Sequence, residues 1–134
     1  MCSSDLPVAA SAGLATLDAL AQPGAFARLE AIATRLADGL RGAAEAAGVP
    51  LVVNQAGAML TPFFTDQPVV DYASAKATDT ARYGRFFWAL LERGVYPPPS
   101  AFEAWFPSLA HDDAALTATL DAVAEALAVA GAAE

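Results

Sequence analysis

Reactive side chains are scarce in this sequence, which has one lysine, Lys76, one histidine, His111, and one cysteine, Cys2. A lysine can act as a Schiff-base nucleophile when a desolvated pocket lowers its pKa. Lys76 instead stands in Ala-Ser-Ala-Lys-Ala-Thr, at the polar start of an expected helix. Because lysine is rarely fully buried, this context predicts a solvent-exposed surface residue.

His111 is followed by Asp112 and Asp113, so it could act as a general base with a carboxylate behind it. No serine or cysteine nucleophile is placed beside it by a motif, and the pattern favours a strand-to-helix junction with an aspartate cap. Cys2 has no histidine or aspartate partner around it, so we do not expect a catalytic thiol. One cysteine and one histidine also exclude an internal disulfide and a zinc site with several histidine ligands.

The segment of residues 94–106 reads Gly-Val-Tyr-Pro-Pro-Pro-Ser-Ala-Phe-Glu-Ala-Trp-Phe. Its Glu103 stands among Phe102, Trp105 and Phe106. Such a glutamate is either a surface residue between aromatic anchors or a carboxylate held in a pocket with a perturbed pKa. The pattern alone favours the surface position. A proline-rich ligand motif is a third reading, but the basic residue usual in such motifs is absent.

Composition narrows the class of protein. The 134 residues carry 7 basic and 15 acidic side chains, a net charge of −8, with 56% hydrophobic and 16% charged residues. This composition excludes a disordered chain, and the acidic balance argues against nucleic acid and anionic membrane surfaces as partners. The apolar stretch 114–133 carries Asp121 and Glu125, which a membrane-spanning helix would not place there. No secretory signal is recognisable, so we expect a soluble cytoplasmic protein.

The pattern of apolar residues predicts the elements. Four helices are expected. The first covers 7–20 and is capped by Ser4 or Asp5, and the second covers 25–47, with a buried stripe that includes Phe26 and an end at Gly48. The third covers 74–93, and the fourth runs from a cap at Asp112 or Asp113 to about 129. Strands are expected over 51–54 and 59–64, joined as a hairpin by a turn at 55–57, and briefly over 95–96 and 108–110. Pro62 predicts an edge or irregular position. This order predicts an α+β fold, a small mainly antiparallel sheet with helices packed on one face.

Several short motifs together resemble one family. They are Gly94-Val95-Tyr96, Pro98-Pro99-Ser100, Phe102-Glu103-Ala104, Phe106 and 108–111, preceded by similar stretches at 7–17, 55–64 and 71–91. They resemble the C-terminal part of glutamate-1-semialdehyde 2,1-aminomutase, a class-III aminotransferase among the fold-type-I pyridoxal-phosphate enzymes. The likeness covers 7–134, as the C-terminal small domain. Residues 1–6 do not match, and we expect a truncation point there. Pro97 and Asp112 also depart from the family's pattern.

The resemblance implies an isomerase of tetrapyrrole and porphyrin biosynthesis, which converts glutamate-1-semialdehyde into 5-aminolevulinate. It implies that pyridoxal phosphate is bound mainly by a large domain outside this chain, so no catalytic, cofactor-binding or metal-binding residue is expected here. Glu103 matches the family's substrate-side glutamate, and Ser100 is a second substrate-binding candidate on the same loop. Lys76 aligns with an ordinary helix position. The expected partners are the large domain and, in the intact enzyme, a second copy in a homodimer.

Two other functions remain open. Typical class-III ω-aminotransferases have an arginine near this loop that grips a substrate carboxylate, whereas no arginine lies between Gly94 and Glu134. This absence favours the aminomutase over another class-III aminotransferase. The chain could also be a non-catalytic α+β interaction module. As a fragment without the cofactor lysine, it is expected to be inactive alone.

Overall fold

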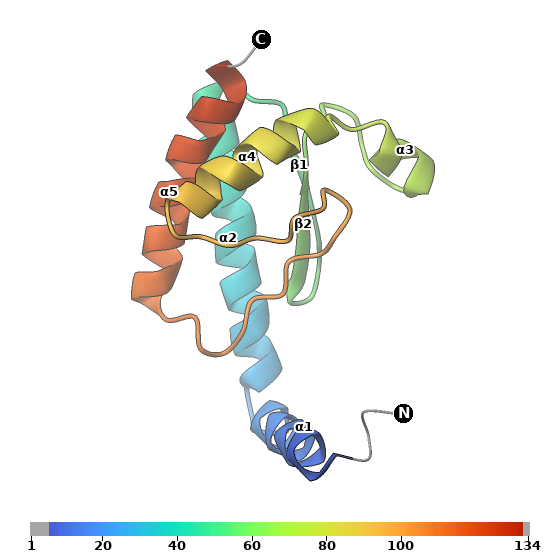
Figure 1. Ribbon diagram of the computed structural model, residues 1–134, viewed down its shortest axis with the longest axis vertical. Coiled ribbons are helices and arrows are strands. Elements are labelled where there is room, and N and C mark those ends of the chain that lie inside the picture. Colours follow the sequence, from blue (N-terminus) through green and yellow to red (C-terminus); the bar gives the residue numbers. More distant parts are fainter. Residues whose placement is uncertain (1–5, 133–134) are drawn as a thin grey trace.

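The computed structural model describes residues 6–132, which form five helices and one two-stranded antiparallel sheet (Figure 1). The elements are α1 (Pro7–Leu20), α2 (Ala25–Ala47), β1 (Val52–Ala56), β2 (Met59–Phe63), α3 (Tyr72–Lys76), α4 (Thr80–Glu92) and α5 (Asp113–Ala132). The predicted α+β class is confirmed. The sheet is smaller than the four predicted strands would make it.

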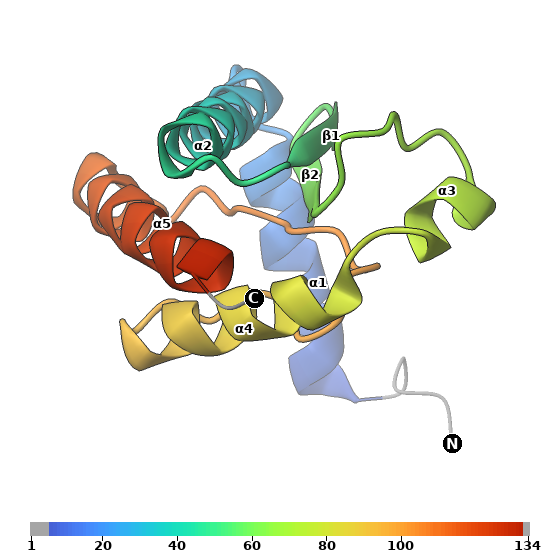
Figure 2. The ribbon, with the colours of Figure 1, turned by 90° about the horizontal axis from the view of Figure 1, so that it is seen from above.

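The three central helices form the core with the hairpin. α5 lies between α2 and α4, and α2 packs against both strands (Figure 2). By length and composition α5 could cross a membrane, but a buried core helix passes the same test, and α5 turns Leu116, Val123 and Leu127 into the core. The core is the shared interior of α2, α4, α5 and the hairpin.

The bounds of α1 and α2 agree with the prediction, and Gly48 ends α2 in the left-handed conformation at φ 65°. Phe26 was expected in the buried stripe but is 67% exposed. It lies in the first turns of α2, which extend beyond the body of the domain (Figure 1). Ala25 and Leu29 in the same turns are buried, so this end of α2 is covered on one side but not on the side that carries Phe26.

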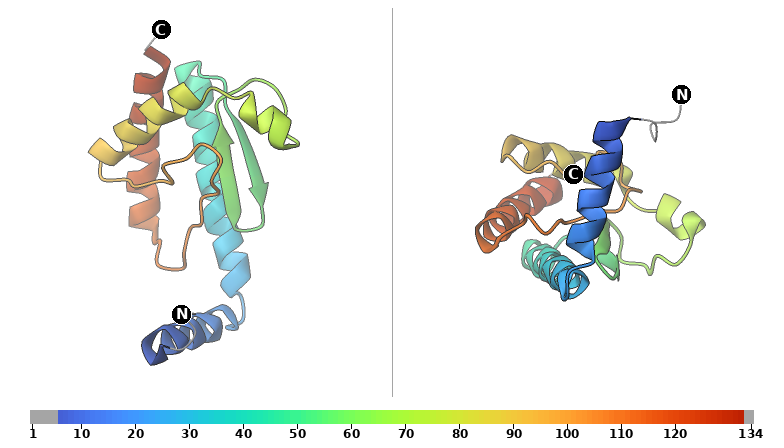
Figure 3. Two further views of the ribbon diagram at one scale, coloured as in Figure 1. Left: turned by 45° about the vertical axis from the view of Figure 1, so that its right-hand side comes forward. Right: turned by 90° about the horizontal axis from the view of Figure 1, so that it is seen from below.

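α1 has no buried residue and lies crosswise at the far end of α2 (Figure 3). Pro7 occupies its first turn as predicted, and Leu6 takes the N-cap position without a side-chain hydrogen bond. Ser4 and Asp5, which were expected to cap this helix, lie outside the described residues. An apolar helix with no buried face needs a partner surface to cover it.

The hairpin pairs Val52 with Phe63 and Ala56 with Met59. Its connection is Gly57-Ala58, with Gly57 at φ 57°, and it begins two residues later than the predicted turn at 55–57 because β1 extends to Ala56. In this register Val53 and Pro62 are a non-hydrogen-bonded pair, so the missing N–H of Pro62 costs β1 nothing. On the outer edge of β2 that same proline limits further pairing, as its edge position predicts.

The predicted helix over 74–93 is wrong, because the chain forms two helices there. Asp71 caps α3 by accepting the Ser74 N–H at 2.8 Å, and Asp79 caps α4 by accepting the Arg82 N–H at 2.8 Å. The Thr78 hydroxyl donates to the Ala75 carbonyl at 2.8 Å between them. A second N-cap signal within the stretch therefore starts a new helix.

The predicted strands at 95–96 and 108–110 are also wrong. Residues 95–99 run without a strand partner, since three consecutive prolines offer no N–H to a ladder. At 108–110 the chain turns, and the Ser108 N–H donates to His111 Nδ1 at 3.0 Å. Within residues 94–112, Trp105 alone forms a bridge to the hairpin, opposite Leu60.

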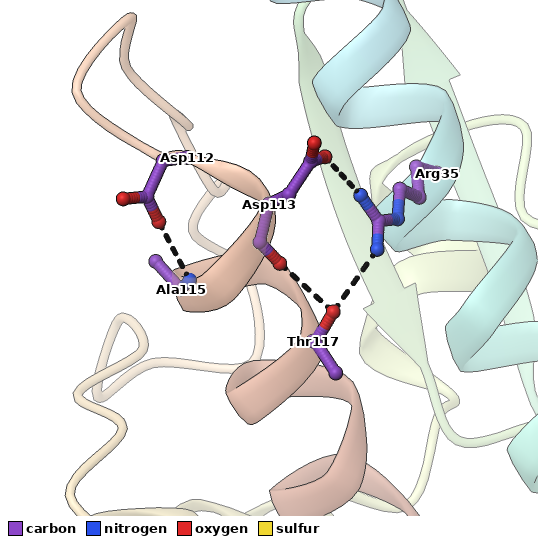
Figure 4. A network of polar contacts seen from close by, with 5 residues as sticks. All are labelled: Arg35, Asp112, Asp113, Ala115 and Thr117. Carbon is purple, nitrogen blue, oxygen red and sulfur yellow. Dashed lines mark hydrogen bonds and ion pairs between the residues drawn. The ribbon is translucent and has the colours of Figure 1, made fainter.

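A polar network joins α2 to the start of α5 (Figure 4). Arg35 contacts Asp113 at 2.6 Å and donates to the Thr117 hydroxyl at 3.1 Å. Asp112 accepts the Ala115 N–H at 2.8 Å and is the cap of α5. Since Asp113 is exposed, we expect its ion pair to contribute only about 0–1 kcal/mol.

Two glycines of α2 give a matched test of the α2–α5 packing. A methyl group at Gly39 would overlap the Leu120 side chain of α5, whereas nothing lies within 4 Å of the equivalent position at Gly42. We expect Gly42→Ala to raise the free energy of unfolding by about 0.5–1 kcal/mol through helix propensity. Gly39→Ala should lower it by about 1–3 kcal/mol, as overpacking does. Urea denaturation of both variants measures the difference, and equal stabilisation by the two would contradict the close approach.

Candidate functional site

The two residues predicted to face substrate meet in one tight turn, residues 100–103, here called the Ser100–Glu103 turn. The Glu103 N–H donates to the Ser100 carbonyl at 3.2 Å, and the Phe102 N–H donates to the Ser100 hydroxyl at 3.2 Å. The Ser100 N–H in turn donates to Glu103 Oε2 at 3.4 Å. The turn therefore holds its own backbone and displays the glutamate on its outer side.

Two tertiary hydrogen-bonded contacts hold the chain on either side of this turn. Before it, the Tyr83 hydroxyl of α4 donates to the Pro98 carbonyl at 2.5 Å. After it, Trp105 and Leu60 of β2 exchange backbone hydrogen bonds at 2.7 and 3.2 Å. Turn residues between two fixed points have little freedom to move, so the position of Glu103 depends on both contacts.

Aromatic packing supports both contacts. The Trp105 ring, 7% exposed, stacks on Phe86 with centroids 6.4 Å apart and planes 10° from parallel. Phe86 also meets Phe64 and Tyr83 edge to face. These rings belong to α4, to the residue after β2 and to the segment that carries the turn, so one aromatic cluster joins all three.

A cavity of about 690 Å³ lies beneath the segment. Its lining includes the prolines at 97–99 and Trp105 on one side, and Leu36 of α2 and Ala118 of α5 on the other. Pro97 is buried and Pro99 is exposed, so packing covers the start of the proline run but not its end. The hydrogen-bonded contacts at its two ends add to this partial packing.

Tyr83 is the titratable group that the site perturbs most clearly. Burial of the phenol raises its pKa above the usual 10.0, and the nearby negative charge of Glu103 raises it further. The indole N–H of Trp105 lies beside the hydroxyl and acts against this rise, although it makes no hydrogen bond of good geometry within the described residues. Tyr83 therefore keeps its proton, and its donor role, across the neutral range.

Glu103 itself is exposed, as are the flanking Phe102 and Phe106, while Trp105 is buried. In this chain it thus occupies the surface position between anchors that the pattern favoured. A carboxylate with an exposed aromatic rim can accept hydrogen bonds from a ligand or from another part of a larger enzyme. Its assignment to substrate, and that of Ser100, remains a prediction.

The other reactive residues lie apart from the turn. Lys76 is exposed at the end of α3, with Nζ 5.6 Å from the Tyr72 ring centroid, which confirms the predicted surface position. His111 precedes the Asp112 cap as expected, with its Nδ1 accepting the Ser108 N–H. Cys2 lies outside the described residues. Within residues 6–132, no three His, Cys, Asp or Glu residues gather to hold a metal ion.

Tyr83 is the site residue that the sequence analysis did not identify as functional. The available signal was the choice of tyrosine at a buried position, because a buried phenol hydroxyl needs a hydrogen-bond partner. That partner lies 15 residues away in the sequence. The sequence alone could not identify it.

Comparison with known proteins shows which proteins this chain is similar to in sequence. No family model matches it. It is 60% identical over 104 residues to the glutamate-1-semialdehyde 2,1-aminomutase of Myxococcus xanthus, covering 78% of this chain and 24% of that protein. It is 52% identical over 121 residues to the Roseiflexus castenholzii aminomutase and 53% over 123 to that of Heliobacterium modesticaldum, covering 90% and 92% of this chain and 28% of each relative. The chain thus spans about a quarter of the length of these relatives, and it is homologous to their C-terminal part.

Solved structures with a similar fold are transaminases, and this chain again matches about a quarter of each. An ω-transaminase from Sphaerobacter thermophilus aligns at a TM-score of 0.67 and 26% identity, covering 81% of this chain and 25% of that one. A transaminase with PLP bound aligns at 0.74 and 25% identity, covering 94% and 28%. The fold is therefore that of the C-terminal part of transaminases.

The raised pKa of Tyr83 predicts how stability depends on pH. In the unfolded chain the phenol releases its proton near pH 10, earlier than in the folded chain. Its contribution to the free energy of unfolding is thus fully present below pH 10 and is lost as the pH rises through the folded value. Chemical denaturation from pH 8 to 11 should show a steeper decline for the wild type than for Tyr83→Phe. An identical decline in the two proteins would contradict the raised pKa.

Proposed function

We propose that this chain is the C-terminal small domain of a glutamate-1-semialdehyde 2,1-aminomutase, the enzyme that converts glutamate-1-semialdehyde into 5-aminolevulinate for porphyrin biosynthesis. The observation that carries the proposal is an identity of 49–60% to aminomutases over most of the chain. Identity to the transaminases of known structure is 25–26%. This difference favours the aminomutase over another class-III aminotransferase.

The arginines near the turn support the same choice. Arg93 is the last arginine in the sequence and directly precedes the segment 94–106 that carries the turn. Its Nε donates to Glu125 at 2.8 Å and its Nη1 donates to the Ala89 carbonyl at 2.7 Å. A guanidinium engaged in this way does not offer the free bidentate fork of a carboxylate clamp.

Pyridoxal phosphate is the cofactor of this enzyme class, and the residues of this chain do not fit it as a covalent site. The covalent link needs a lysine in a desolvated pocket. The sole lysine, Lys76, is exposed beside Tyr72 and lines none of the cavities described. We therefore assign cofactor binding to the large domain of the intact enzyme and assign no catalytic residue to this chain.

The large domain is the partner we propose for this chain, within a cytoplasmic homodimer. The relatives are about four times as long as the matched region, so most of each relative lies outside it. α1 offers Leu14 and Leu17 to a covering surface, and Phe106 offers another apolar contact next to the turn. Exposed apolar side chains of this size are typical of surfaces that are buried in an assembly.

In the intact enzyme, the Ser100–Glu103 turn would form one wall of the substrate site. The substrate and the product each carry an amino group, and an ionised carboxylate accepts strong hydrogen bonds from such groups. Glu103 would accept this hydrogen bond and orient the amino end. The Ser100 hydroxyl lies on the same turn and would be the second polar contact.

The role of Glu103 is tested by Glu103→Gln in the intact enzyme. Loss of a hydrogen bond to a charged group should lower kcat/KM for 5-aminolevulinate formation by about 10- to 100-fold. Glu92→Gln, at an exposed position at the end of α4, is the matched control and should leave it unchanged. If both variants match the wild type, Glu103 does not contact the substrate.

The cofactor assignment is tested with the chain by itself. After incubation with pyridoxal phosphate and reduction with borohydride, mass spectrometry should find no stoichiometric adduct on Lys76, because an exposed lysine lacks the desolvated, oriented pocket that favours the imine. The intact enzyme is the positive control. A stoichiometric adduct on Lys76 would overturn the assignment.

A further inference from the structure

We propose that Tyr83 is a positioning residue, whose hydroxyl fixes the Ser100–Glu103 turn by holding the Pro98 carbonyl. Its effect on the fold is independent of the proposed function, whereas its effect on catalysis rests on that function. The side chain is 2% exposed, and its hydroxyl donates to Pro98 at 2.5 Å, two residues before the turn begins.

The proline run explains why a side chain has to perform this task. Pro97, Pro98 and Pro99 have no N–H groups, so the backbone before the turn cannot be held by donated hydrogen bonds. The carbonyl oxygens of these prolines are their only backbone groups that can form hydrogen bonds. Tyr83 binds one of these carbonyls from the rigid helix α4, and this bond fixes the approach to the turn.

The cavity beneath the segment adds to this dependence. A cavity of about 690 Å³ is lined by residues 97–99, and although Pro97 is buried, Pro99 is exposed, so packing covers only part of the proline run. On the far side of the turn, Trp105 is held to Leu60 by two backbone hydrogen bonds. Tyr83 supplies the one side-chain hydrogen bond described to the approaching prolines.

The packing of the ring does not account for the hydroxyl. The Tyr83 ring meets Phe64 and Phe86 edge to face, with centroids 6.3 and 6.4 Å apart. A phenylalanine would fill the same space in this cluster. Glu103 lies close enough for its charge to act on the phenol, so the hydroxyl, the prolines and the candidate substrate residue form one local unit.

Hydrogen exchange tests the positioning directly. Tyr83→Phe should speed exchange of the Glu103 amide, which closes the turn onto Ser100, by about two- to tenfold, the equivalent of one neutral hydrogen bond. Amides in the middle of α5 serve as the internal reference for intact folding. Tyr96→Phe removes the hydroxyl of a tyrosine that is 74% exposed on the same segment and should change nothing. Unchanged exchange at Glu103 in Tyr83→Phe would overturn the proposal.

A double-mutant cycle in the intact enzyme tests the link to Glu103. Tyr83→Phe should lower kcat/KM about two- to tenfold in the wild-type background but by much less in the Glu103→Gln background, because a positioning residue acts through the group it positions. Equal losses in both backgrounds would show a merely structural role and overturn the inference. If the wild-type enzyme forms no 5-aminolevulinate, the proposed function fails, and hydrogen exchange alone decides the role of Tyr83.

Discussion

The contacts of Trp105 are the constraint on which the rest of the site depends. Its ring stacks on Phe86 of α4, while its backbone exchanges two hydrogen bonds with Leu60 of β2. A segment that contains three prolines cannot form a strand of its own, so it is held to the domain by a few separate contacts. Trp105 gives the strongest of these, since it combines burial of a large ring with paired backbone groups. The hairpin and α4 therefore fix the end of the turn that carries Glu103.

The helices were predictable because their signals are local. In α2, apolar residues recur every three or four positions and a glycine ends the pattern, so both bounds agree with the sequence. The stretch from 72 to 92 shows the limit of that reasoning, because the caps at Asp71 and Asp79 divide one apolar pattern into two helices. Phe26 shows another limit, since periodicity cannot say which side of a helix end the neighbouring elements cover. The strands expected at 95–96 and 108–110 needed partners that the tertiary structure does not provide.

In the candidate site too, local sequence signals predicted some of the residues, whereas the others depend on tertiary contacts. Glu103 and Ser100 were identified from a motif, and their closeness follows from a separation of three residues. Tyr83 could not be joined to Pro98 from the sequence, because the contact depends on how α4 packs against the segment. The two readings of Glu103 were also not separable from its neighbours alone. The structure places it at the surface of this chain, where further contacts come only from a partner.

The charges around the turn argue for a division of tasks within the proposed enzyme. From Gly94 to Glu134 the sequence has no lysine or arginine, and Arg93 just before it is engaged by Glu125. The wall that this chain presents therefore combines a carboxylate with aromatic edges. Such a wall attracts the amino end of an amino acid and repels its carboxylate. We expect the cations that bind the substrate carboxylate to come from outside residues 94–134, so this wall would orient the substrate through charge and shape while the reactive groups lie elsewhere.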